Sequence, residues 1–279
     1  LAQSELQITH ISLRDINIQL NNTKLPSFEA TISLTPLGQI ASATVSLKEQ
    51  AATAKLMPLG NDYKVSISAK KLTLPIGAPI SFQALKADGF VNAHALNLEH
   101  VQATFYGGNI EGNSSFDWSA DWRATGKLTI QEASLEGLAP NFGTIQAKGD
   151  LSTELDFSTS ATDVETLFDK PMLKARFTIE KGEIGWIDII RAIQVAKKNM
   201  AINGTTNFDQ LSGQLSINNG RYTFEQLALK SGNMRATGAF SIQENQQLKG
   251  NIRVNLNTAS RNVKSTLQLS GSTPHPRTK

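Results

Sequence analysis

The side chains best suited to metal chemistry are four dispersed histidines: His10, His94, His100 and His275. A bound metal ion needs three or four converging ligands. Glu99 beside His94 and His100 makes the one cluster with that potential, and ordinary surface side chains of a strand explain it better. The chain has no cysteine, which excludes thiolate sites and disulfides. We predict no metal site and no cofactor.

Asp117 and Asp121, each followed by a tryptophan, resemble a catalytic carboxylate pair. Such a pair needs a pocket that raises the pKa of one member, whereas these two lie beside an expected turn and are better explained as solvated acids. The glycine-rich segments 106–108 and 182–185 do not lead from a strand into a helix, so neither predicts a phosphate cradle. No Gly-x-Ser-x-Gly motif occurs. We expect no catalytic residue and no enzymatic activity.

The stretch Lys174–Asp188 alternates apolar and polar side chains, which is the period of a strand with one apolar face. Glu180–Gly182 reads as a tight turn in which Gly182 supplies the positive φ, so we predict a hairpin. Similar phrases follow Gly126 and surround Asn218–Gly220, where we expect another turn. The repetition has no fixed period and indicates a repeated supersecondary unit with loops of variable length.

Composition supports a β protein. Of 279 residues, 39% are hydrophobic and 18% charged, and the polar remainder is typical of exposed strands. We predict a mainly β fold: an elongated, curved antiparallel sheet of repeated β units forming an apolar groove, with two short helices. Residues 1–279 are expected to form one region, with less distinct β units over 1–95, clearer ones over 96–270 and a disordered tail over 271–279. Phase shifts at Thr9–His10 and Arg14–Asp15 predict turns or bulges.

The net charge is +3, and the basic residues are scattered without a block of interleaved aromatics, so we expect no nucleic-acid partner. No apolar run approaches the ~20 residues that span a bilayer. The start at Leu1 looks arbitrary, and we expect a C-terminal fragment of a longer protein.

Two helices are expected. One begins with a capping box at Thr162–Glu165 and stops before Pro171. The other is capped by Asp188 and runs to Met200. Its apolar side chains are Ile189, Ala192, Ile193, Ala196 and Met200, and its basic ones are Arg191, Lys197 and Lys198. We favour a helix that packs on the sheet; the alternative is an interfacial helix whose three basic residues touch membrane headgroups.

The chain resembles the C-terminal region of AsmA-like proteins, most clearly over 96–270. The resemblance rests on Tyr106-Gly107-Gly108-x-Ile110-x-Gly112, the phrase from Phe177 to Asp188, and the pattern from Thr206 to Gly220, followed by Leu229, Ser231 and Gly238. It implies a periplasmic protein, anchored in the inner membrane of Gram-negative bacteria and related to TamB-like and YhdP-like proteins and, in outline, to bridge-like lipid-transfer proteins. The anchor would lie outside this chain, and the family supplies no catalytic residue.

These observations together predict a non-catalytic groove for phospholipid or another acyl-chain lipid, acting in lipid transport and outer-membrane homeostasis. An envelope protein partner is possible. One alternative is an assembly factor for outer-membrane proteins with a closed β-sandwich core; a weaker one is a hydrolase of envelope polymers. The candidate groove residues are Phe177, Ile179, Ile184, Trp186, Leu215, Ile217, Tyr222, Phe224, Leu227, Leu229 and Phe240.

Overall fold

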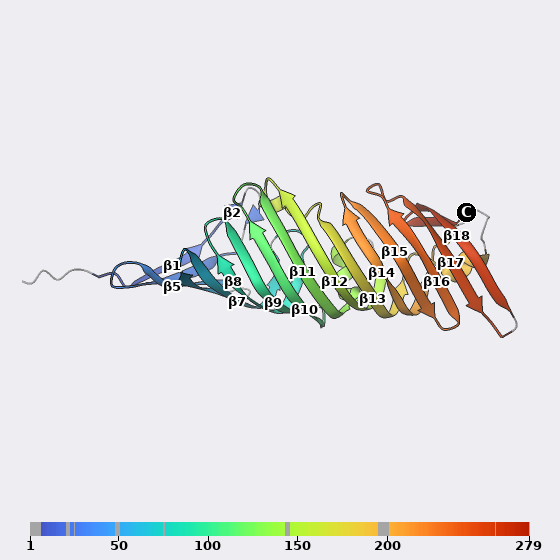
Figure 1. Ribbon diagram of the computed structural model, residues 1–279, viewed down its shortest axis with the longest axis horizontal. Coiled ribbons are helices and arrows are strands. Elements are labelled where there is room, and N and C mark those ends of the chain that lie inside the picture. Colours follow the sequence, from blue (N-terminus) through green and yellow to red (C-terminus); the bar gives the residue numbers. More distant parts are fainter. Residues whose placement is uncertain are drawn as a thin grey trace, which may run out of the picture. The chain divides into compact units, whose positions relative to one another are not determined.

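A computed structural model describes residues 7–20, 23–24, 26–47, 51–74, 76–142, 146–194, 201–259 and 261–278. Seventeen strands form one open antiparallel sheet, which confirms the predicted β fold class. β1 pairs with β4, and from β4 to β19 each strand is the neighbour of the next, as the succession of colours in Figure 1 shows. Sequence order is therefore sheet order throughout, the arrangement of a meander.

The strands of this sheet have the following bounds: β1 His10–Ile16, β4 Phe28–Leu34, β5 Ile40–Leu47, β6 Ala52–Leu59, β7 Asp62–Thr73, β8 Ser81–Val91, β9 Ala95–Phe105, β10 Gly108–Asp117, β11 Trp122–Ser134, β12 Ala147–Ala161, β13 Met172–Ile184, β14 Thr206–Asn218, β15 Arg221–Ser231, β16 Met234–Ile242, β17 Leu248–Asn257, β18 Asn262–Ser272 and β19 His275–Thr278. A separate two-stranded sheet pairs β2 (Gln19–Leu20) with β3 (Thr23–Lys24). The helical elements are α1 (Leu135–Leu138), α2 (Ile189–Gln194) and the 3₁₀ turns Ala139–Phe142 and Val164–Thr166.

The chain divides into two compact units. Unit 1 comprises residues 1–105, 110–126 and 160–167, and unit 2 comprises residues 106–109, 127–159 and 168–279. In unit 1 the sheet buries small side chains, such as Ala69, Ala87 and Ala103, which lie opposite Leu85, Ile67 and Leu85 respectively on neighbouring strands. Unit 2 holds the larger core.

In unit 2 the register keeps apolar side chains on one face of the sheet, because directly opposed residues of antiparallel strands point the same way. One cross-strand row runs from Ala175 through Leu215, Phe224 and Phe240 to Gly250. A parallel row runs along Leu173, Ile217, Tyr222, Ile242 and Leu248. We call this side of unit 2 the apolar face and the opposite side the polar face.

The predicted hairpin at Lys174–Asp188 is wrong. β13 is one continuous strand that pairs with β14 from Leu173 to Ile184, straight through the expected turn. The positive φ belongs to Lys181 (φ 50) rather than to Gly182. A Cβ on Gly182 would collide with the ring of Phe208 and with the carbonyl oxygen of Lys148. Gly182 is therefore required for close packing and not for a turn.

Single residues with positive φ inside strands explain the shifts of phase in the sequence. Asp15 (φ 54) lies where the β1–β4 register shifts, and Gln226 (φ 51) lies where the β15–β16 register shifts. The bulge at Gln226 keeps Leu227 and Phe224 on one face although they are three positions apart. The phase shift predicted at Arg14–Asp15 is thus confirmed as a bulge, and the turn at Asn218–Gly220 is confirmed between β14 and β15.

Three other expectations need correction. The segment after Gly126 belongs to the single strand β11 and opens no hairpin. The predicted helix at Thr162–Glu165 is only the 3₁₀ turn Val164–Thr166, whose preceding Asp163 makes no side-chain cap. The tail expected to be disordered contains β19, which pairs with β18 and buries Pro276 and Thr278.

The side of β19 that faces away from β18 is occupied by the segment Ala201–Asn203. Ala201 forms a β-bridge with Arg277, and the Ile202 amide donates to the Pro276 carbonyl at 3.2 Å. The Asn203 side chain donates to the Pro274 carbonyl at 2.8 Å. These contacts tie the strand to the segment that follows α2.

Helix α2 packs on the apolar face as the favoured interpretation predicted. Ile189 and Ala192 are buried at 3% and 0% exposure, in one cluster with sheet residues that include Phe208, Ile252 and Leu267. Asp188 caps the helix, since its carboxylate accepts the Arg191 amide hydrogen at 2.8 Å. The buried Thr206 hydroxyl donates to the Ile187 carbonyl at 2.7 Å and accepts the Ile189 amide at 3.0 Å. The described helix ends at Gln194, and the predicted Ala196, Lys197, Lys198 and Met200 lie outside the described residues.

We predict that Gly182→Ala lowers the free energy of unfolding by about 1–3 kcal/mol, because the new methyl group overpacks against Phe208. Chemical denaturation monitored by circular dichroism measures the change. Glu180→Ala on the same strand replaces an exposed side chain and should stay within about 0.5 kcal/mol of the parent. Equal effects of the two substitutions would contradict the assigned packing.

We further predict that Asp188→Ala destabilises unit 2 by about 1 kcal/mol through loss of the cap on α2. Asp188→Asn keeps an accepting oxygen and should retain most of the stability. If the asparagine variant lost as much stability as the alanine variant, the Asp188 carboxylate would not act mainly as a helix cap. The measurement is the midpoint of thermal unfolding.

Candidate functional site

Four aromatic rings lie next to one another on the apolar face of unit 2. Phe224 stacks on Phe240 with ring centroids 4.6 Å apart, and Phe177 meets the edge of Phe224 at 6.5 Å. Trp186 meets Phe240 at 6.0 Å in a T-shaped arrangement. Each such pair stabilises the array beyond its buried area. All four were predicted as groove residues, and the register and the bend after β13 bring them together.

Glycines make room for this array where strands lie directly opposite an aromatic ring. Gly213 is opposed to Phe177, and a Cβ there would press against Leu227 and the Phe177 ring. Gly250 is opposed to Phe240, and a Cβ there would collide with the Cβ of Phe240. A side chain at either position would push the rings off the sheet.

The apolar face has a covered part and an open part. The covered part lies under α2 and Trp186, and it includes Leu229 among the buried residues and Ile179, Ile184 and Phe240 among those packed against them. Phe177 is also buried, at 8% exposure. The open part consists of half-buried apolar side chains that are not packed against the buried cluster. We define it by Leu173, Leu215, Ile217, Tyr222 and Phe224.

The eleven candidate groove residues therefore do not share one environment. Ten of them belong to β13–β16, and Trp186 follows directly after β13. Leu215, Ile217, Tyr222 and Phe224 line the open part, whereas the packed core is formed or bordered by Ile179, Ile184, Trp186, Leu229 and Phe240. Phe177 is buried outside that cluster, and Leu227 is half-buried. Leu173 was missed by the sequence reasoning. Its place two residues before Ala175 in the alternating pattern could have identified it.

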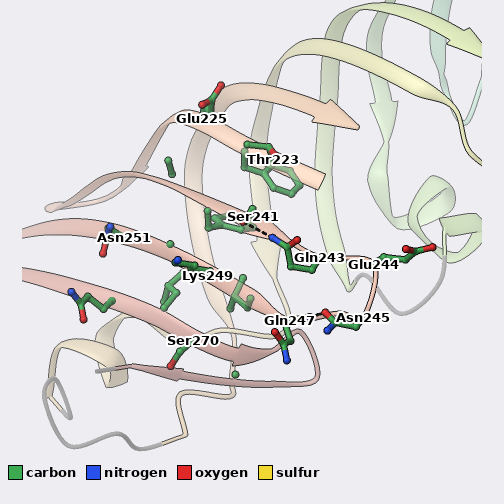
Figure 2. A pocket seen from close by; sticks show the side chains of 18 residues that line it. Thr223, Glu225, Ser241, Gln243, Glu244, Asn245, Gln247, Lys249, Asn251 and Ser270 are labelled. Carbon is green, nitrogen blue, oxygen red and sulfur yellow. Dashed lines mark hydrogen bonds between the residues drawn. The ribbon is translucent and has the colours of Figure 1, made fainter. Parts of the chain in front are cut away.

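An open concavity of about 1500 Å³ lies along β15–β18 and the β16–β17 turn. Figure 2 shows side chains of its lining, with Thr223 and Glu225 from β15, Ser241 from β16, and Lys249 and Asn251 from β17. At its rim the Gln243 amide donates to the Ser241 hydroxyl at 3.4 Å. Phe224 and Phe240 also line it, so the concavity adjoins the aromatic array. Its lining mixes polar side chains, among them Glu225, Glu244 and Lys249, with apolar ones.

The basic side chains predicted to meet headgroups are only partly placed. Arg191 is exposed on α2, next to the buried Ala192. Lys197 and Lys198 lie outside the described residues, so the predicted trio stays a prediction.

Apart from His275 at the start of β19, the remaining chemical candidates lie in unit 1. His100 is an exposed residue of β9 opposite Asp88, and His94 is in the preceding loop, where its amide donates to the Asn92 side chain at 2.9 Å. Among the described residues, no three histidine, aspartate or glutamate side chains converge as metal ligands. Glu99 is exposed on the same strand as His100.

Asp117 and Asp121 flank an ordered turn. The Asp117 carboxylate accepts the Ser119 hydroxyl at 2.7 Å and the Ser119 amide at 3.0 Å. These two hydrogen bonds, the hydroxyl first, hold the pKa of Asp117 below its usual value. The Trp118 indole donates to the Ala93 carbonyl at 2.7 Å, and its ring lies 6.0 Å from that of Trp122. The lowered pKa suits a structural carboxylate and not a proton donor.

We predict that Ser119→Ala raises the pKa of Asp117 toward its ordinary value, because the larger of the two hydrogen-bond contributions is lost. Since folding lowers this pKa, its stabilising contribution is present above the ordinary aspartate pKa and fades as the pH falls through the lowered one. NMR titration of the Asp117 carboxyl carbon tests the shift, with the parent protein as the reference. An unchanged Asp117 titration in the variant would refute the assignment.

Within the described residues, the helices are all too short or too polar to cross a bilayer. No curated protein and no solved structure matches the chain. The model of the AsmA family matches residues 43–227, which is well over half of the sequence. The match begins earlier than the resemblance seen from residue 96 and ends before residue 270. It includes β13, β14 and the first part of β15, which carry all five residues of the open part of the apolar face. The chain therefore belongs to the AsmA family.

Proposed function

We propose that unit 2 binds the acyl chains of lipids on the open part of its apolar face and carries out no covalent chemistry. The observation that supports this is the half-buried row of Leu215, Phe224 and their neighbours, which lies outside the buried cluster and beside a stacked aromatic array. Membership of the AsmA family is compatible with lipid transport or with envelope assembly.

An exposed contiguous apolar surface is uncommon on soluble monomers and generally marks a binding site. The neighbouring part of the same face is covered by α2, so the fold has a means of burying such residues and leaves Leu215, Ile217, Tyr222 and Phe224 uncovered. Contacts among these side chains span β14 and β15 without a charged residue on that face between them. A flexible hydrocarbon chain needs no more specific recognition than this.

The energetics favour holding a lipid without trapping it. Transfer of ~16 methylene groups from water to an apolar surface gains roughly 12 kcal/mol at ~0.8 kcal/mol each. Relative to a bilayer the same transfer is close to neutral, because the hydrocarbon is already out of water. A lipid can then slide along the face while its headgroup stays hydrated. The direction of net lipid movement would be set by a driving force outside this chain.

On this proposal the protein acts in the periplasm as part of an inner-membrane-anchored chain related to TamB-like and YhdP-like proteins, and contributes to phospholipid transport and outer-membrane homeostasis. An envelope protein partner would deliver the lipid to this chain or receive it from the chain. The competing assembly role requires a closed sandwich core. The described strands instead form an open sheet whose apolar face is covered in part by a helix, which favours the lipid role.

We predict that the purified chain carries phospholipid in native mass spectrometry and that Leu215→Asp removes most of it, by about tenfold or more, because a carboxylate on the open part repels hydrocarbon. Leu215 is half-exposed, so the variant should keep its fold and its circular dichroism spectrum.

Ser216→Asp is the matched control, since it introduces the same charge one position away on the polar face, opposite Lys174 and Thr223. It should retain the lipid. A parent protein that is free of lipid, or a Leu215→Asp variant that retains it, would refute the proposal.

A further inference from the structure

The polar face of unit 2 gathers positive charge that is dispersed in the sequence. From Ala228 onward the chain contains a single acid, Glu244, and eight basic residues: Lys230, Arg235, Lys249, Arg253, Arg261, Lys264, Arg277 and Lys279. Glu244 is already engaged in an ion pair with Lys170, 3.6 Å away. The last part of the chain therefore has a strong local excess of positive charge, although the whole chain has a net charge of only +3.

The register places four of these cations together. Lys230 is opposite Arg235, Arg235 is opposite Asn255, and Asn255 is opposite Lys264, which makes one row across β15–β18. Arg253 stands two positions from Asn255 on β17 and so faces the same side. We call Lys230, Arg235, Arg253 and Lys264 the basic patch. With strands ~4.8 Å apart, the row extends over roughly 15 Å.

The basic patch has no acidic partner among the described residues. All four side chains are exposed, and none of them forms an ion pair. Arg235 donates to the carbonyl oxygens of Gly232 and Met234, which fixes its side chain at the end of β16. The nearby acids are Asp209, which accepts the Gly232 amide at 2.8 Å, Glu225 near the middle of β15, and Glu180 of β13, which lies two strands from Lys230 in the same row across Gln210. Four uncompensated cations in one patch attract a partner that is itself anionic.

The surroundings of the patch indicate what kind of anion it suits. The residues between the cations are small and polar, chiefly Thr237, Asn255 and Thr266, and the four strands present no aromatic side chain on the polar face. Protein partners are usually anchored by buried aromatic or apolar side chains, and single-stranded nucleic acids by stacking on aromatic ones. A surface that offers only spread positive charge is suited to a layer of anionic headgroups.

We propose that the basic patch adsorbs unit 2 to an anionic phospholipid bilayer, with the polar face of β15–β18 turned toward the headgroups. This contact is electrostatic and separate from acyl-chain binding, which takes place on the opposite face of the sheet. It would hold the open part of the apolar face near a membrane without inserting any element into it. The attraction acts within about one Debye length, ~10 Å at 0.1 M salt, so adsorption weakens as salt is raised.

The test is sedimentation of the full chain with vesicles of phosphatidylglycerol and phosphatidylcholine, compared with vesicles of phosphatidylcholine alone. The parent should bind the anionic vesicles at low salt, release them at high salt and ignore the neutral vesicles. Replacing Lys230, Arg235, Arg253 and Lys264 together by glutamine should weaken binding by about tenfold or more, because each basic residue near such a surface contributes a several-fold gain.

The matched control replaces Lys55, Lys64, Lys70 and Lys86 of unit 1 by glutamine. These side chains are also exposed, and the control has the same net charge as the patch variant. It should bind nearly as the parent does. If both variants lost vesicle binding equally, net charge alone would explain the binding, and the proposal would be overturned. A parent that ignores anionic vesicles but binds a polyglutamate peptide would assign the patch to an acidic protein and also overturn it.

Leu215→Asp separates this inference from the proposed function. That variant should still sediment with anionic vesicles, since its substitution lies on the other face. A parent protein that carries no lipid but binds anionic vesicles would count against acyl-chain binding alone, and a parent that carries lipid but ignores anionic vesicles would count against the basic patch alone.

Discussion

The constraint on which unit 2 depends is cross-strand register. Because side chains alternate along a strand, a slip of one residue between β15 and β16 would move Phe240 and Ile242 to the polar face and bring Arg235 toward the core. The apolar face and the basic patch on the polar face both depend on this pairing of β15 with β16. The bulge at Gln226 is the local adjustment that allows this pairing to continue on both sides of an extra residue.

The apolar face has a covered part and an open part because α2 and its flanking residues pack on only some of it. Between β13 and β14, the described residues 185–194 and 201–205 include α2, and they bury Ile187, Ile189 and Ile202 against the neighbouring strands. The Thr206 hydroxyl hydrogen-bonds to the Ile187 carbonyl and the Ile189 amide in that buried region, so fewer buried polar groups of this connection are left without partners. What α2 does not reach is left half-exposed, and that remainder is the candidate binding surface.

Alternation in the sequence was sufficient to predict the fold class, most strands and the common face of the groove candidates, because a period of two is a local property. It also identified Asp188 as a helix cap. It failed at Lys181–Gly182, since a glycine that avoids the Phe208 ring looks the same in sequence as a glycine that makes a turn. Alternation also could not predict that Phe177 is buried while Leu215 lies in the open part, or that Lys230 and Lys264 lie in one patch. Both facts depend on strand pairing between residues that are distant in the sequence.

The contacts of Ala201–Asn203 with β19 have a consequence for association between molecules. A strand with free amide and carbonyl groups on one side is a template on which another chain can add by backbone pairing. Here the Pro276 nitrogen has no hydrogen to offer, its carbonyl is taken by Ile202, and Arg277 is bridged to Ala201. The outer side of β19 thereby resists pairing with copies of the chain, and its resistance to fibrous aggregation would come from the segment Ala201–Asn203.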